Sequence, residues 1–317
     1  MSISRRKFIK NAGTAALIAP VVTSPINAIH LKPTAEPLKV HVFSKQLQFL
    51  DVKEAGQIAA ELGFDGLDLT VRPNGHVLPE NVLTDLPSAI RDIKSAGSRC
   101  ELITTAISDI DNSADKDIIK VAAEEGVSFY RCNWFKFLVD RSFEDSLIYY
   151  REKVRLLSEY NKAHNIVGCY QNHSGTNVGA SMWEVKNILE TADPEFFGVQ
   201  YDIRHAVVEG GKSWTNGLKL VKDQIKTIVL KDFKWGKLNG KWQTINVPVG
   251  EGMVDFITYF RLLKSYGLKP TVSLHLEYPL GGAENGQSKI TVDKKVVFSA
   301  MKKDLTTVQQ LWKDAGL

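Results

Sequence analysis

The feature that most constrains the fold is a regular alternation of short apolar runs with longer amphipathic segments. Eight runs have the pattern of buried strands: 38–43, 66–71, 99–104, 127–132, 166–170, 198–201, 225–230 and 270–276. Each is followed by apolar residues at helical spacing, over 52–62, 81–96, 114–125, 143–164, 181–190, 213–222, 254–266 and 292–312. Alternating strands and helices predict a parallel sheet. Eight such units in about 280 residues predict a single-domain (β/α)₈ barrel.

A doubly wound open sheet is the alternative fold. Sheets of that kind bind dinucleotides at a Gly-x-Gly-x-x-Gly turn after a strand. None of the eight expected strands is followed by such a turn. We therefore favour the barrel and expect no nucleotide cofactor. A small β-hairpin is also expected at 235–247, because Asn239-Gly240 suits a two-residue hairpin turn.

Residues 1–28 have the features of a twin-arginine export signal. Arg5 and Arg6 precede a weakly apolar run at 12–22, and the segment ends at the small residue Ala28. We expect cleavage after Ala28, a linker at 29–37, the barrel over 38–317 and a periplasmic location. A disordered basic tail or an uncleaved anchor is the alternative, although the apolar run is short for a bilayer span.

The charge balance argues against a nucleic acid partner. The signal contains four basic residues and no acidic ones, so 36 of the 40 Lys and Arg remain to balance 36 Asp and Glu. A neutral mature chain has no electrostatic footprint for nucleic acid. Nothing after residue 28 has the pattern of a membrane helix. Cys100, Cys132 and Cys169 lie within expected strands, which predicts buried thiols rather than disulfides.

Polar residues gather at the ends of the expected strands. Four of the seven histidines lie there, with two cations and three carboxylates: His76, His173, Asp202, Arg204, His205, Lys231, Asp232, His275 and Glu277. A barrel brings the carboxyl ends of its strands to one face, where barrel enzymes carry out their chemistry. Asp232 is expected to be structural, His173 has turn bracing as its structural alternative, and His41, inside a strand, is expected to be a satisfied core histidine.

Two of these residues favour function on energetic grounds. His275 and Glu277 are two residues apart and so point to the same side of the last strand. An inward-pointing glutamate at the end of a core strand is costly unless it is paired or bound to a metal. The same argument holds for Lys231, whose structural alternative is an ion pair with Asp202 or Glu277.

Six motifs follow one another at barrel spacing. They are Gly66-Leu67-Asp68-Leu69-Thr70, Gln171-Asn172-His173, Tyr201-Asp202-Ile203-Arg204-His205, Leu230-Lys231-Asp232, Gly250-Glu251-Gly252 with Val254-Asp255-Phe256, and Leu276-Glu277. In this order, over residues 38–315, the chain resembles the sugar phosphate isomerase/epimerase group of xylose isomerase-like barrels. The motifs indicate this superfamily but not a particular substrate.

The resemblance implies a site for a divalent metal ion, often Mn²⁺. The usual ligands are an acid on strand five, an Asp on strand six, a His on strand seven and a Glu on strand eight. Asp202 and Glu277 match, whereas Gln171 replaces the acid and Val229 replaces the His. His173 or His205 would complete the set, because mixtures of imidazole and carboxylate suit Mn²⁺ and Zn²⁺. The alternative is a metal-free site with Lys231 as the cation that stabilises an oxyanion.

These features predict an exported enzyme that removes a proton next to the carbonyl of a sugar or keto-sugar. Isomerisation, epimerisation or elimination would follow, as in the lyases of 3-keto-glycosides that the chain resembles. The expected site residues are Lys231, Glu277 and His205 for catalysis, with His173 as a further candidate base; Asp202, Glu277, His173 and Gln171 for metal; and His76, Arg204 and His275 for substrate. A periplasmic substrate is expected to lack phosphate.

Two other functions remain open at this point. One is a periplasmic sugar-binding barrel that has lost catalysis, which the two missing metal ligands favour and Lys231 and Glu277 oppose. The other is an endonuclease of the same superfamily, which the neutral charge and the incomplete metal ligands oppose. The sequence does not indicate an oligomeric state.

Overall fold

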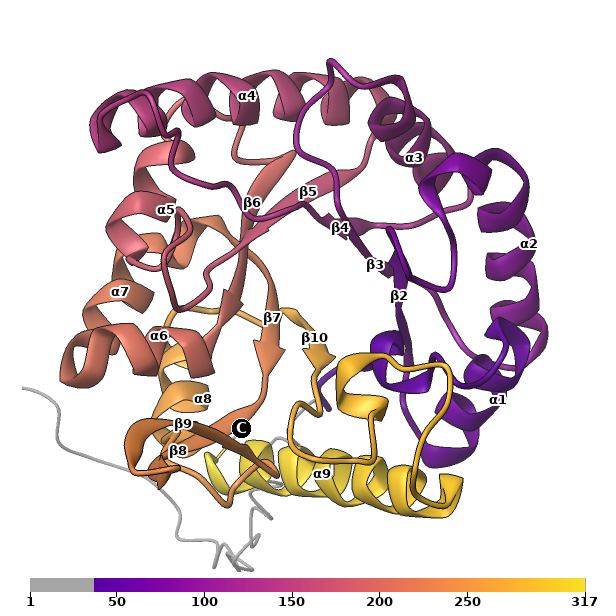
Figure 1. Cartoon of the computed structure of the whole chain (residues 1–317). Coiled ribbons are helices and arrows are strands. Elements are labelled where there is room, and N and C mark those ends of the chain that lie inside the picture. The colour runs from indigo at the N-terminus through magenta and orange to yellow at the C-terminus, as the bar shows by residue number, and fades with distance from the viewer. Residues whose placement is uncertain (1–36, 317) are drawn as a thin grey trace, which may run out of the picture. The chain divides into compact units, whose positions relative to one another are not determined.

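Eight parallel strands close into a barrel in the computed structural model, which describes residues 37–316 (Figure 1). In chain order they are β1 Val40–Phe43, β2 Gly66–Val71, β3 Leu102–Thr105, β4 Phe129–Arg131, β5 Val167–Gln171, β6 Phe197–Asp202, β7 Ile225–Leu230 and β10 Thr271–Leu274. The first strand pairs with both β2 and β10, which closes the sheet. The expected (β/α)₈ barrel is confirmed. The expected signal at 1–28 and the linker up to residue 36 lie outside the described residues.

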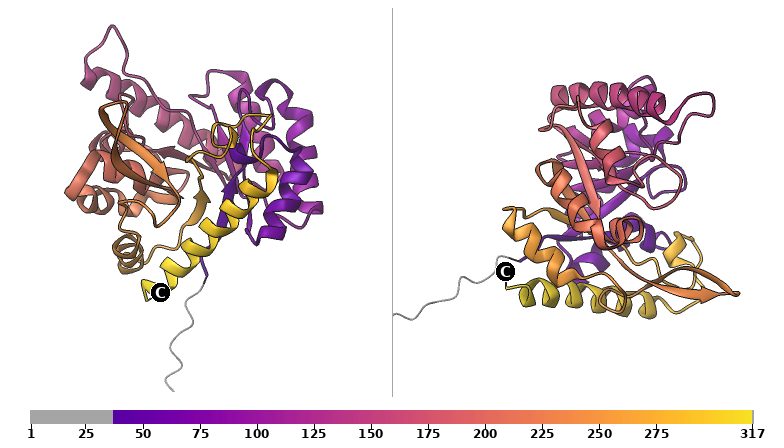
Figure 2. Two further views of the ribbon diagram at one scale, coloured as in Figure 1. Left: turned by 60° about the horizontal axis from the view of Figure 1, so that its bottom comes forward. Right: turned by 90° about the vertical axis from the view of Figure 1, so that its left-hand side faces the viewer.

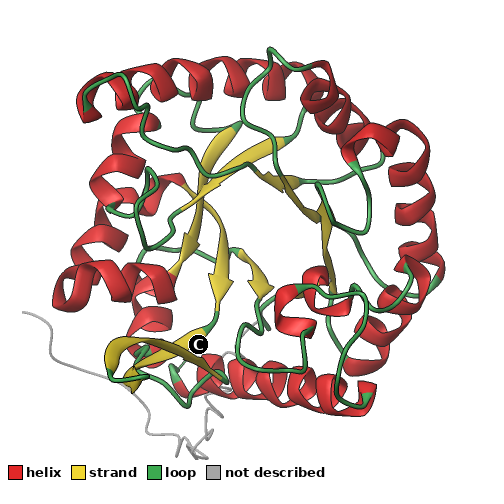
Figure 3. Ribbon diagram, in the orientation of Figure 1, coloured by secondary structure: helices red, strands yellow, loops and turns green. Residues whose placement is uncertain are grey.

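Helices form a ring around the strands (Figure 3). They are α1 Val52–Leu62, α2 Val82–Ser95, α3 Ser113–Glu124, α4 Phe143–His164, α5 Met182–Ile188, α6 Ile203–Gly210, α7 Trp214–Val221, α8 Phe256–Ser265 and α9 Lys294–Asp314. The residues at which the helices begin and end are set by capping side chains and by glycines, as α1 shows. Asp51 begins α1 in a capping box with Glu54, and Gly63 ends it with φ 88°.

Helix α6 was not expected from the sequence, which indicates no helix between the strand at 198–201 and the helix at 213–222. It begins directly after β6, because the side chain of Asp202 accepts a hydrogen bond from the backbone N–H of His205 at 3.0 Å. Ile203 and Ala206 supply its buried face. The early helix start carries Arg204 and His205 over the end of the barrel.

The last barrel strand is also shorter than expected. β10 ends at Leu274, so His275 and Glu277 lie beyond the strand rather than within it. The backbone still follows the neighbouring strand for one more step, since His275 N–H donates to the carbonyl of Leu230 at 3.0 Å. Both residues therefore remain at the carboxyl end of the barrel.

A β-hairpin projects from the end of β7 (Figure 2). Its strands are β8 Asp232–Leu238 and β9 Lys241–Val247, so it begins three residues earlier than expected and turns at Asn239-Gly240 as expected. In its register Phe233 pairs with Asn246, Trp235 with Thr244, and Lys237 with Trp242. These three pairs are two positions apart along each strand, so their side chains lie on the same face of the hairpin.

The core lies inside the barrel and between the strands and helices. Its largest fully buried side chains include Tyr130, Tyr170, Tyr201 and Phe197. All three cysteines are free and buried, which confirms the expectation for their thiols. Within the described part of the chain, no helix is long and apolar enough to cross a membrane.

Candidate active site

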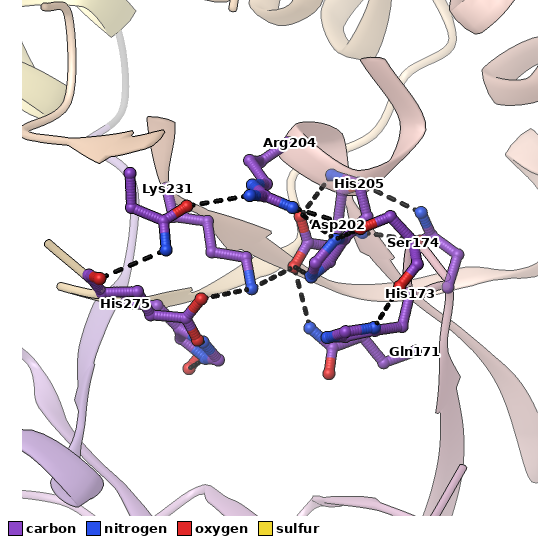
Figure 4. Close-up of polar contacts among 12 residues, drawn as sticks. Gln171, His173, Ser174, Asp202, Arg204, His205, Lys231 and His275 are labelled. Carbon is purple, nitrogen blue, oxygen red and sulfur yellow. Dashed lines mark hydrogen bonds and ion pairs between the residues drawn. The ribbon is translucent and has the colours of Figure 1, made fainter. Parts of the chain in front are cut away.

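A buried ammonium group joins two carboxylates at the carboxyl end of the barrel (Figure 4). The Nζ atom of Lys231, directly after β7, lies 3.2 Å from Oδ2 of Asp202 and 3.1 Å from Oε2 of Glu277. The side chains of Asp202 and Lys231 are 0% and 3% exposed, and that of Glu277 is 23% exposed. Because β6, β7 and β10 are neighbours in the barrel, the three residues meet although they are far apart in sequence.

Gln171, the last residue of β5, completes the surroundings of Asp202. Its Nε2 donates to Oδ2 of Asp202 at 2.8 Å, and its Oε1 accepts from a guanidinium N–H of Arg131 at 3.2 Å. A guanidinium donates hydrogen bonds and does not accept them, so this contact fixes which end of the amide faces Asp202. Gln171 therefore presents N–H, not a lone pair, to the carboxylate.

His205 is held as a neutral ring. Its Nδ1 lies 3.1 Å from Nη1 of Arg204 and 2.8 Å from the hydroxyl of Ser174. Because the guanidinium donates, Nδ1 is the acceptor and the proton is on Nε2, which lies 3.6 Å from Oδ2 of Asp202. Burial, and next the charge of Lys231, lowers the pKa of His205 well below its usual value. The lone pair that a base needs is already engaged.

His173 has the opposite arrangement of its ring nitrogens. Nδ1 donates to the backbone carbonyl of Ser174 at 2.8 Å, so Nε2 carries the lone pair. The ring lies between Trp134 and His205, with centroid separations of 4.5 and 3.9 Å. Burial, and next Lys231, lowers the pKa of His173. A neutral imidazole with its lone pair on Nε2 is suited to accept a proton.

Glu277 is kept ionised by two lysines and a histidine around it. Burial alone would raise its pKa, but Lys231, His275 and Lys45 outweigh burial and hold the pKa well below its usual value. Its Oε1 lies 3.6 Å from both Nζ of Lys45 and Nδ1 of His275. The end of this side chain thus contacts a cation through each of its two oxygens.

His275 lies beneath Glu277 rather than at an open surface. Its ring stacks on Phe43 at 4.2 Å, and its Nε2 lies 3.0 Å from the hydroxyl of Ser273. That hydroxyl is in turn 2.6 Å from Oδ2 of Asp68 inside the barrel. Burial lowers the pKa of His275 to about 3. Its Nδ1 contacts Glu277, and its expected role in substrate binding stays a prediction.

The other expected site residues occupy different surroundings. His76 lies apart from the cluster, with Nδ1 3.1 Å from the hydroxyl of Ser44 and 3.3 Å from that of Thr70. Arg204 is inside the cluster and also reaches the hairpin, where its Nη2 donates to Oδ1 of Asn246 at 2.9 Å. Roles in substrate binding for these two residues stay predictions.

Residues with a structural role behave differently. The carboxylate of Asp232 accepts hydrogen bonds from the backbone N–H groups of Phe233, Gly250, Gly252 and Val254, at 2.8 to 3.2 Å. The expectation of a structural Asp232 is confirmed. His41 is buried as expected, but neither ring nitrogen has a hydrogen-bond partner among the described residues.

Lys45 is a site residue that the sequence analysis did not select. It lies two residues beyond Phe43, the last residue of β1, in the 3₁₀ helix η1 Ser44–Leu47. The strand-end pattern that selected Lys231 was therefore present at this position as well. Burial lowers the pKa of Lys45.

The arrangement of these residues does not fit a divalent metal ion. The space between the carboxylates of Asp202 and Glu277 is taken by an ammonium, which has a positive charge and no lone pair. Gln171 turns N–H toward Asp202. Across residues 37–316, no group of three or more His, Cys, Asp and Glu side chains is arranged to hold a metal ion.

Comparison with known proteins agrees with this fold. The family described as xylose isomerase-like TIM barrel matches residues 56–292. Over 95 residues the chain is 34% identical to an inosose dehydratase of Mesomycoplasma hyopneumoniae strain J, a stretch that covers 30% of this chain and 31% of that protein. The chain thus matches under a third of that relative's length.

Two solved structures show the same fold across most of the chain. The 3-keto-D-glucoside 4-epimerase from E. coli has a TM-score of 0.61 and 15% identity, with 85% of this chain and 99% of that chain covered. A xylose isomerase-like TIM barrel protein from Mycobacterium smegmatis in complex with magnesium has a TM-score of 0.63 and 13% identity, with 89% and 98% covered.

Proposed function

The chain belongs to the xylose isomerase-like TIM barrel family, and we propose that it is an enzyme that removes a proton alpha to the carbonyl of a keto-sugar. The observation that carries the proposal is that a neutral imidazole with its lone pair on Nε2, that of His173, and a buried ammonium, that of Lys231, lie at the same end of the barrel (Figure 4). A base and a cation at the same end of a barrel suit the formation of an enediolate.

Lys231 has the capacity to stabilise the charge that forms on the substrate oxygen. An ammonium has three N–H donors, and the nearby carboxylates of Asp202 and Glu277 account for two of them. The third N–H is left for a substrate carbonyl oxygen. As the proton leaves the alpha carbon for His173, the negative charge moves to that oxygen and is met by a cation already in place.

The enediolate has three onward routes. A proton returned to the opposite face of the same carbon gives an epimer, and a proton given to the neighbouring carbon gives an isomer. Loss of a substituent beta to the carbonyl, with a proton given to its departing oxygen, gives elimination. The similar proteins named above are a dehydratase and an epimerase, whose names fit two of these routes.

We further propose an unphosphorylated substrate in the periplasm. The support is the export signal expected at 1–28, because the periplasm holds few phosphorylated sugars. A 3-keto-glycoside suits this location and the elimination route. In such a substrate carbons 2 and 4 flank the carbonyl. Loss of the proton at carbon 2 gives the enediolate, and the bond from carbon 1 to the aglycone oxygen then breaks as a double bond forms between carbons 1 and 2. The departing oxygen takes up a proton.

The test is hydrogen exchange at the acidic carbon. Incubation of the protein with a 3-keto-glucoside in D₂O should place deuterium at carbon 2 or carbon 4, or release the aglycone. Lys231→Met should slow this by more than about tenfold, since one lost oxyanion contact typically costs roughly 2.7–4 kcal/mol. Lys303→Met serves as the matched control, because that lysine is 60% exposed and pairs with Glu251 away from the cluster.

The second candidate function is a sugar-binding barrel without catalysis. Gln171 and Val229 favour it, since they stand where the family resemblance places metal ligands. If neither the 3-keto-glucoside nor a simple ketose exchanges or reacts, and calorimetry still detects a bound sugar, this function replaces the first one.

A further inference from the structure

We propose that the ammonium of Lys231 takes the place of a divalent metal ion in this chain, so that the site holds no such ion. That Lys231 acts in catalysis rests on the proposed function, whereas the statement that the site binds no divalent ion does not. A protein of the same fold from Mycobacterium smegmatis has been solved in complex with magnesium.

The two carboxylates are spaced for an ammonium. Both oxygens lie 3.1–3.2 Å from Nζ of Lys231, which is a hydrogen-bonding distance. A metal ion of the Mn²⁺ or Zn²⁺ kind would draw its oxygen ligands to roughly 2.0–2.2 Å. Because Lys231 is 3% exposed and follows β7 directly, its charged end has little room to move aside. A second cation would have to enter against this charge.

Gln171 is matched to the single charge of Lys231. Its Nε2 lies 2.8 Å from the carboxylate of Asp202, so a carboxylate at position 171 would bring two negative groups into contact. A divalent ion would neutralise that contact, but an ammonium would not. Asp202, Glu277 and Lys231 together carry one net negative charge, which is also the charge of three carboxylates around a divalent ion. The amide and the ammonium therefore compensate for each other.

The histidines do not rebuild the missing ligand positions. Nδ1 of His205 already accepts hydrogen bonds from Arg204 and Ser174, and its Nε2 carries a proton. Val229, which pairs with Asp202 in the barrel register, has an aliphatic side chain. His173 alone keeps a lone pair, and one imidazole nitrogen with two carboxylates already bound to an ammonium is a poor divalent site.

The first measurement is the metal content of the full chain. The protein is incubated with Mn²⁺, Zn²⁺ or Mg²⁺, desalted and analysed by mass spectrometry of the metals, and its melting temperature is recorded with and without chelator. We expect less than about a tenth of an equivalent of any metal and no change in melting temperature. One equivalent of tightly held metal, whose removal lowers the melting temperature, would overturn the proposal.

The second measurement reverses the replacement. The double variant Lys231→Ala with Gln171→Glu should acquire about one equivalent of Mn²⁺ and melt at a higher temperature when Mn²⁺ is added. Lys231→Ala alone, which lacks the third carboxylate, is the matched control and should acquire much less. If the double variant is folded by circular dichroism but binds no Mn²⁺, Lys231 and Gln171 are not what keeps a metal ion out of the site, and the proposal is overturned. If that variant does not fold, the metal content of the unaltered chain decides.

The two proposals fail in different ways. Metal content and melting temperature need no substrate, so they are informative even if the deuterium exchange test is negative. A metal-free protein that exchanges no deuterium refutes the proposed reaction and leaves Lys231 in the place of the ion. A protein that needs bound metal for exchange refutes this inference and supports the reaction.

Discussion

Replacing His173 with Gln should remove most of the activity, whereas the same change at His205 should remove much less. Glutamine keeps hydrogen-bonding atoms but cannot take a proton. General bases contribute typically about 10²–10⁴-fold to a rate. Because burial, and next the charge of Lys231, lowers the pKa of His173, its neutral form is favoured at neutral pH and can act as the base. We expect a loss of about 10²-fold or more for His173→Gln.

His205→Gln is the matched control because the two rings are in contact, 3.9 Å apart. Its Nδ1 is an acceptor for Arg204 and Ser174, a role that the side-chain oxygen of Gln can fill. We expect His205→Gln to lower the exchange rate by less than about tenfold, which corresponds to the loss of one ordinary hydrogen bond.

The assay is the initial rate of deuterium exchange across pH 5 to 9, at a temperature where the protein stays folded. In the unaltered protein the rate should fall as the pH drops below the ordinary histidine value, because protonation of His173 removes its lone pair. Glu277 does not account for this decline, because Lys231, His275 and Lys45 hold its pKa well below its usual value. If the decline persists unchanged in His173→Gln, or if His205→Gln is the more damaging change, the assignment of the base is wrong.

Three further predictions concern stability and export. Asp232→Ala leaves four backbone N–H groups without their acceptor, so urea unfolding should show a loss of at least about 3 kcal/mol, and unchanged stability would contradict this. Burial lowers the pKa of His41 to about 4 and that of His275 to about 3. The unfolded chain then takes up protons below pH 6.5 that the folded chain refuses, so stability is complete above pH 6.5 and declines toward pH 4, by up to about 1.4 kcal/mol per pH unit for each histidine. His41→Asn should make the melting temperature less dependent on pH, and an equally steep dependence would count against it. Changing Arg5 and Arg6 to Lys should leave precursor in the cytoplasm, as judged by cell fractionation, and normal export would rule out a twin-arginine signal.

The fold was predictable because its pattern is local and repeats. Each strand is a short apolar run, and most helices begin at a capping residue such as Asp51 or end at a glycine such as Gly63. Helix α6 escaped prediction because it has only 8 residues, which is too few for a clear helical period. Its start depends on the side chain of Asp202, which caps the helix through Oδ1 and contacts Lys231 and Gln171 through Oδ2.

The composition of the site was predictable, but its hydrogen bonding was not. The barrel alone implied that Lys231, Asp202 and Glu277 would meet, because the ends of neighbouring strands share one face. The proton positions on His173 and His205 depend on a backbone carbonyl and a guanidinium that side-chain packing places. No spacing in the sequence encodes such contacts. The resemblance to metal enzymes implied metal ligands at Asp202 and Glu277, whereas in the structure both carboxylates contact the ammonium of Lys231.

The hairpin divides into a fixed base and a free tip. At the base, Asn246 accepts from Arg204 and donates to the backbone carbonyl of Glu277 at 3.2 Å, which ties the ribbon to two strand ends. Toward the tip, Trp235 and Trp242 are 47% and 67% exposed. Residues at the tip can therefore be exchanged, or the ribbon lengthened, while the barrel and its cluster of charges stay as they are. The tip of the hairpin is therefore the place where a new binding preference can be grafted without disturbing the contacts at its base.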